Sequence, residues 1–107
     1  MAKMNREALE KIASKFRALS EPTRLAIIQE LKRGPMTVNQ IVVALGLSQA
    51  NVSKQLGILR DAQFLKREQQ GVTAVYSIDD PMVIELCALV CDQLNKQAAA
   101  AIQSYSI

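Results

Sequence analysis

Two cysteines, Cys87 and Cys91, are the residues of this chain best suited to chemistry. They stand four positions apart, so a helix would place both thiols on one face. A direct disulfide would distort that helix, because the Cβ atoms of such a pair lie roughly 5–6 Å apart, whereas a disulfide needs about 3.5–4.5 Å. A longer polysulfide link would fit the gap better. Three interpretations stay open: the cysteines pack as small apolar residues, they form a switch for oxidants or reactive sulfur, or four cysteines from two copies hold a metal.

Other catalytic and metal-binding chemistry lacks the residues that it needs. The chain of 107 residues contains no histidine. No nucleophile–base pair suggests itself, and no glycine-rich phosphate loop is present. We therefore expect no enzyme and no cofactor.

A second set of residues suits the recognition of nucleic acid. In the stretch LGLSQANVSKQLGIL, Val52, Leu56 and Leu59 recur at helical spacing and should point inward. The small residues Ala50 and Gly57 on the opposite side would permit close approach to the major groove, which is about 12 Å wide. The polar residues that could contact bases or phosphates are Ser48, Gln49, Asn51, Ser53, Lys54 and Gln55. An ordinary solvated helix face is the alternative interpretation.

The elements around this stretch predict a helix-turn-helix over residues 37–62. Thr37 can cap a short first helix, and Gly46 can end it in a left-handed turn. Ser48 can then cap the second helix.

From residue 64 the pattern changes to that of a β-hairpin. Two β-capable runs, 64–68 and 72–78, are separated by Gln69, Gln70 and Gly71, which we expect to form the tip. A hairpin that directly follows a helix-turn-helix is typical of a wing. The basic residues at its base, Lys66 and Arg67, suit contacts with phosphate or with the minor groove.

Amphipathic helices are predicted at both ends, over about 5–19 and 81–102. A further helix should begin after Ser20, its expected cap, with Pro22 in the first turn. The fold class is thus mainly α with a small β-hairpin wing, in the order α-α-α-α-β-β-α, within one domain, 1–107. The apolar stripes of the end helices need burial that so small a domain cannot provide twice, which predicts a homodimer. Its expected interface is Leu9, Ile12, Phe16, Val83, Cys87, Val90 and Leu94.

Charge is distributed in favour of a polyanionic partner. The formal net charge is +3, and residues 1–47 carry eight Lys/Arg against four Asp/Glu. Residues 72–107 carry only Lys96 against four acidic residues. DNA would therefore dock on the front and middle of the chain. The N-terminus lacks the apolar run of a signal peptide, and no run is long enough to span a membrane, so we expect a cytoplasmic protein.

Three blocks of sequence resemble the ArsR/SmtB family of winged helix-turn-helix repressors. They are FRALSEPTRLAII (16–28), LGLSQANVSKQLGILRDAQFL (45–65) and VYSI (75–78), in the order and spacing of that family. The resemblance implies a homodimer joined by its first and last helices. It also implies binding to an inverted-repeat DNA operator, which blocks transcription. Gln55 stands where the family often has His, and Gln63 where a Gly usually follows Ala.

The metal sites of that family are not inherited. Its thiol-rich motif would map to Thr37, Asn39 and Val42, none of which is a thiol, and the sites on its last helix use His. Sulfur-sensing relatives usually place their two cysteines on different helices. A winged helix that binds only protein partners remains the rival to a DNA-binding regulator.

Overall fold

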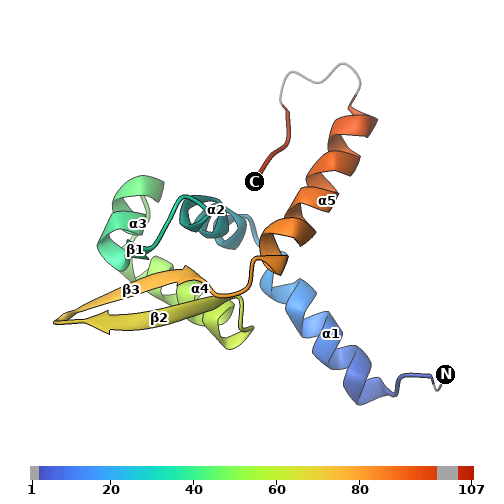
Figure 1. Cartoon of the computed structure of the whole chain (residues 1–107), viewed down its shortest axis with the longest axis horizontal. Helices are drawn as coiled ribbons and strands as arrows, with labels where there is room; N and C mark the ends of the chain where they lie inside the picture. Colours follow the sequence, from blue (N-terminus) through green and yellow to red (C-terminus); the bar gives the residue numbers. More distant parts are fainter. Residues whose placement is uncertain (1–2, 99–103) are drawn as a thin grey trace.

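The computed structural model describes residues 3–98 and 104–107, which form five helices and a small sheet (Figure 1). The predicted element order is confirmed, with one short strand in addition. The elements are α1 (Arg6–Ala18), α2 (Pro22–Leu31), β1 (Met36–Thr37), α3 (Val38–Leu45), α4 (Gln49–Asp61), β2 (Leu65–Gln70), β3 (Thr73–Ile78) and α5 (Met82–Gln97). Of the last helix predicted to reach 102, residues 99–102 lie outside the described part.

Local caps fix the helix-turn-helix as its sequence predicts. The Thr37 hydroxyl accepts from the backbone of Gln40, whose side chain accepts in return from the Thr37 backbone, a capping box. Gly46 ends α3 with φ of 66°, a left-handed conformation that costs a glycine little. Ser48 caps α4 by accepting from the backbone N–H of Asn51 at 3.2 Å.

The expected cap of α2 is wrong. Its N-cap is Glu21, whose carboxylate accepts from the backbone N–H of Arg24 at 3.1 Å. The hydroxyl of Ser20 instead donates to the carbonyl of Arg17 at 2.8 Å. Ser20 thus satisfies a free carbonyl at the end of α1 rather than the start of α2.

The sheet has three antiparallel strands in the order β1-β3-β2. Strand β1 pairs Met36 with Tyr76, and its two residues are too few to give a pattern in the sequence. The wing tip also differs from the prediction, because Gln69 and Gln70 are paired within the ladder, opposite Ala74 and Thr73. The connection is made by residues 71–72 alone.

The hydrophobic core lies between α2, α3, α4 and the sheet, and the first turn of α5 packs on it through Val83 and the half-buried Ile84. Val52, Leu56 and Leu59 are fully buried, as their spacing predicts. Burying each such side chain contributes roughly 1.5–3 kcal/mol. Val83 is also fully buried in this core. Its assignment to the dimer interface is therefore wrong, because the first turn of α5 packs on its own domain.

Helices α1 and α5 project from this body at the end opposite the wing tip (Figure 1). The molecule is flat, with principal extents of 48 × 42 × 21 Å. Among the described residues, no helix is long and apolar enough to cross a membrane.

Candidate nucleic-acid interface

Helix α4 turns a polar face outward because its apolar face is fully used. Gln49, Ser53 and Lys54 are exposed, Ser48 is exposed at the cap, and Asn51 is half-buried. The helix cannot rotate without exposing the buried residues on its other side. Its polar side chains are therefore held in one direction by the core.

Packing against the described residues does not require glycine at position 57. A Cβ built there would find no heavy atom within 4 Å. Glycine in a helix interior nevertheless costs about 0.5–1 kcal/mol relative to alanine. The glycine at position 57 is explained if another molecule approaches the helix closely at this point.

The prediction that Gln55 contacts DNA is wrong. Its side chain is only 9% exposed and lies inside the domain. Its Oε1 accepts from Nη1 of Arg24 at 2.7 Å, and its Nε2 donates to Oδ1 of Asn51 at 3.0 Å. The helical position alone did not reveal this, since the partner Arg24 stands 31 residues earlier.

The wing presents positive charge on both of its faces. Lys66 pairs with Ser77 and Arg67 with Tyr76, and neighbouring side chains of a strand point to opposite faces. Arg67 Nη2 donates to Oε1 of Gln69 at 3.0 Å, and Gln69 Nε2 donates to the carbonyl of Gly71 at 3.0 Å. All the predicted wing residues, Lys66, Arg67, Gln69, Gln70 and Gly71, are exposed.

These wing cations have no acidic partner within the described residues. The one ion pair found there joins Arg6 to Glu10 at 3.1 Å, on α1. Among the described residues, no carboxylate therefore competes with an outside anion for Lys54, Lys66 or Arg67. Because DNA binding gains from the release of counterions by Lys and Arg, this arrangement favours a phosphate backbone as the partner.

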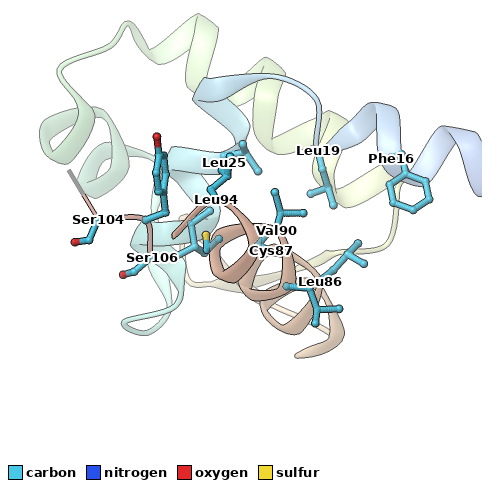
Figure 2. A pocket seen from close by; sticks show the side chains of 13 residues that line it. Phe16, Leu19, Leu25, Leu86, Cys87, Val90, Leu94, Ser104 and Ser106 are labelled. Carbon is cyan, nitrogen blue, oxygen red and sulfur yellow. The ribbon is translucent and has the colours of Figure 1, made fainter. Parts of the chain in front are cut away.

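Helices α1 and α5 together expose an apolar surface, which includes Leu9, Ile12, Phe16, Val90 and Leu94. Beside them lies a hollow of about 540 Å³, lined mainly by apolar side chains of α5, with Phe16 and Leu19 at the end of α1, Leu25 of α2 and residues 104–107 of the C-terminal segment (Figure 2). Leu19, Cys87, Val90 and Leu94 are among its lining residues, and Figure 2 shows Phe16 at one end and Ser104 and Ser106 at the other. A surface of this kind marks a site of association rather than a solvated face.

The chain matches the family model described as bacterial regulatory protein, arsR family, over residues 21–67, from the cap of α2 into β2. It is 35% identical over 85 residues to the HTH-type transcriptional regulator NmtR of Mycobacterium tuberculosis, covering 79% of this chain and 71% of that one. The chain belongs to the arsR family. The family consists of regulatory proteins, so the prediction that the chain is no enzyme is confirmed.

Solved structures of similar proteins share the whole fold of this arsR-family chain. The crystal structure of Rv0081 from M. tuberculosis superposes with a TM-score of 0.80 at 28% identity, covering 89% of this chain and 96% of that one. The solution structure of the homodimeric winged helix-turn-helix DNA-binding domain of Mb0332 from Mycobacterium bovis gives 0.80 at 26% identity, covering 96% and 98%. The predicted winged helix-turn-helix is confirmed.

Both cysteines of this family member are free, with Cys87 buried and Cys91 half-buried. Burial raises the pKa of the Cys87 thiol, and the charge of a Cys91 thiolate would raise it further. The thiolate is the reactive form of cysteine, so Cys87 is a poor nucleophile at neutral pH. Within the described residues, no three His, Cys, Asp or Glu side chains lie close enough to hold a metal ion.

Gln63, which stands where the family usually has Gly, adopts a left-handed conformation with φ of 69°. Lys15 holds this turn: its Nζ donates to the carbonyl of Ala62 and, at 3.3 Å, to Oε1 of Gln63. The same ammonium lies 5.6 Å from the centre of the Phe64 ring. Contacts from α1 thus support a backbone strain that glycine would not have.

Proposed function

We propose that this regulator is a homodimeric repressor that binds an inverted-repeat operator in the cytoplasm. Helix α4 would lie in the major groove and read bases with Gln49, Asn51, Ser53 and Lys54. The wing would contact the backbone through Lys66, Arg67 and its tip. The observation that carries this proposal is the exposed polar face of α4, which the core holds in place and which wing cations flank; these cations have no acidic partner in the described part of the chain.

The dimer follows from the apolar surface of α1 and α5. Phe16 and Val90 are each 56% exposed in the single chain, and both line the hollow described above. A second copy related by a two-fold axis would cover the same patch on both chains. Such a pair places two α4 helices symmetrically, which calls for an inverted repeat. The structurally similar Mb0332 domain is homodimeric.

For the cysteines we propose packing next to this surface. The raised pKa of Cys87 and its burial favour an unreactive apolar role over a thiol switch. The inducer of such a repressor would then act elsewhere.

The test is DNA binding measured against salt concentration, with duplexes first selected from random sequences. We expect the logarithm of affinity to fall linearly with the logarithm of salt. Arg67→Ala should weaken binding to all duplexes nearly equally and reduce the salt slope by about one. Arg6→Ala on α1 removes the same formal charge and is the matched control, with an unchanged slope.

Two outcomes would count against the proposal. An unchanged affinity and slope in Arg67→Ala would remove the wing from the interface. No salt-dependent DNA binding by the unaltered protein would favour the rival, a winged helix that binds only protein partners.

A further inference from the structure

Arg24 joins three helices through one side chain. It stands in the first turn of α2 and is half-buried. Its Nε donates to the carbonyl of Ala18 at 2.7 Å, and its Nη2 donates to that of Arg17 at 3.2 Å. These carbonyls lie at the C-terminal end of α1, where backbone acceptors are free and the helix dipole is negative. The remaining arm, Nη1, donates to Oε1 of Gln55 on α4 at 2.7 Å.

The bond from Arg24 determines which way the Gln55 amide faces. A guanidinium only donates, so the amide oxygen of Gln55 must point toward Arg24. The NH₂ of Gln55 then points the other way and donates to Oδ1 of Asn51, one turn earlier on α4, at 3.0 Å. Every buried side-chain nitrogen or oxygen in the described part of the chain has a partner. Reversing the Gln55 amide would break both bonds in a buried place, which makes this orientation stable.

Asn51 receives its orientation from Gln55 in turn. Its side-chain oxygen is engaged, and no hydrogen bond between described residues uses its Nδ2. Asn51 is half-buried and follows the exposed Gln49 and Ala50 in the first turn of α4. Its NH₂ is thus the arm left to donate to another molecule. Acceptors of the matching kind in the major groove are purine N7, guanine O6 and thymine O4.

We propose that Arg24 and Gln55 are positioning residues for DNA recognition, which hold Asn51 with its NH₂ directed to an acceptor on a base edge. The inference rests on the proposed function, in which the N-terminal turn of α4 meets the bases. The hydrogen bonds from Arg24 to the end of α1 also connect α1 to α4. One side chain fixes both the helix of the proposed dimer contact and the helix that reads DNA.

The experiment is a double-mutant cycle on Gln55→Met and Asn51→Ala. The measured quantity is the ratio of the Kd for an unrelated duplex to the Kd for a selected duplex, at one salt concentration. Methionine keeps the length of Gln55 but loses both hydrogen bonds. We expect each single substitution to lower the ratio about tenfold, and the double substitution to lower it no further. Gln29→Met, at an exposed glutamine on α2, is the matched control and should keep the ratio.

Arg24→Lys extends the test to the first residue of the hydrogen-bonded relay Arg24–Gln55–Asn51. Lysine keeps the positive charge but lacks the planar fork that reaches α1 and Gln55 together, so the ratio should also fall. Where this variant fails to fold, the Gln55→Met cycle decides alone.

Two results would overturn the relay. One is a double substitution that multiplies the single effects to about a hundredfold, since independent sites are additive in free energy. The other is a Gln55→Met protein with a lower melting temperature and an unchanged ratio, which would leave Gln55 a purely structural role. An unaltered protein without preference among duplexes would instead refute the proposed function, and the relay with it.

Discussion

Helices α4 and α5 differ in what they expose: α4 exposes no large apolar side chain, whereas α5 exposes several among its polar residues. The exposed residues of α4 include Gln49, Ser53 and Lys54, which are polar. Those of α5 include Leu89, 68% exposed, and Val90, 56% exposed. Within one small domain, therefore, the exposed side of α4 suits water, whereas part of the exposed surface of α5 is apolar.

The difference lies in how many apolar residues of each helix are buried in the core. Three apolar residues of α4 are fully buried, so its apolar side is covered by the core. Its outer side carries polar residues that can bind another molecule. Helix α5 has Val83 and Cys87 buried in its first two turns and Ile84 packed on the core, whereas its apolar residues Leu89, Val90 and Leu94 remain exposed in the single chain. We infer that α4 is built to meet a ligand and α5 to meet a second copy.

Removing the second copy should produce the largest effect. Phe16→Glu places a charge on the apolar surface, so we expect monomers in sedimentation. Loss of paired binding should weaken operator affinity by about 10²–10⁴-fold. Val43→Glu, at an 82% exposed apolar residue of α3 outside that surface, should leave the dimer intact. A Phe16→Glu dimer of unchanged stability would refute this interface.

Removing a polar residue from α4 should have a smaller effect, specific to the DNA sequence. Lys54→Ala should lose about 1–3 kcal/mol of binding free energy or alter the preferred bases, provided that Lys54 contacts base edges. Gln49→Ala should behave similarly. The measurement is repeated selection from random DNA, and an identical preference in both variants would remove them from base reading.

Adding a methyl group at Gly57 of α4 should change folding stability and DNA affinity in opposite directions. Gly57→Ala should stabilise the fold by about 0.5–1 kcal/mol, because no atom obstructs the new methyl group. DNA affinity should nevertheless fall if the groove approaches that point. Gly46→Ala is the contrasting control: its φ of 66° is unfavourable for alanine, so stability should drop. Stronger DNA binding by Gly57→Ala would show that no close approach occurs there.

The cysteines should give the smallest effect of all. Because the pKa of Cys87 is raised, little of this thiol is ionised at neutral pH, and alkylation should quicken as pH rises above the ordinary thiol range. Cys87→Ser/Cys91→Ser should bind DNA as the unaltered protein does, with or without oxidant or sulfane sulfur. DNA release by a thiol reagent in the unaltered protein alone would restore the switch.

Features that depend on neighbouring residues could be predicted from the sequence. The caps at Thr37 and Ser48, the left-handed Gly46 and the buried stripe of α4 each follow from residues within one or two turns. The same holds for the exposed cations of the wing. These features define the helix-turn-helix and most of the candidate DNA surface.

Features that depend on distant partners could not be predicted in this way. Gln55 looked like a surface residue because its guanidinium partner on α2 is far away in the sequence. Val83 fits the stripe of its helix equally well whether the first turn of α5 docks on its own core or on another chain. Strand β1 exists only because Met36 and Thr37 lie beside β3.

The central claim is that α4 binds DNA while α1 and α5 bind a second copy of the chain. Its most direct test is the stoichiometry of the complex with a selected duplex, measured by sedimentation. We predict two protomers on a duplex with two half-sites, whose centres lie about 10–10.5 bp or a multiple of this apart. Scrambling one half-site should abolish tight binding. One protomer per duplex at saturation, or full affinity for a single half-site, would contradict the account.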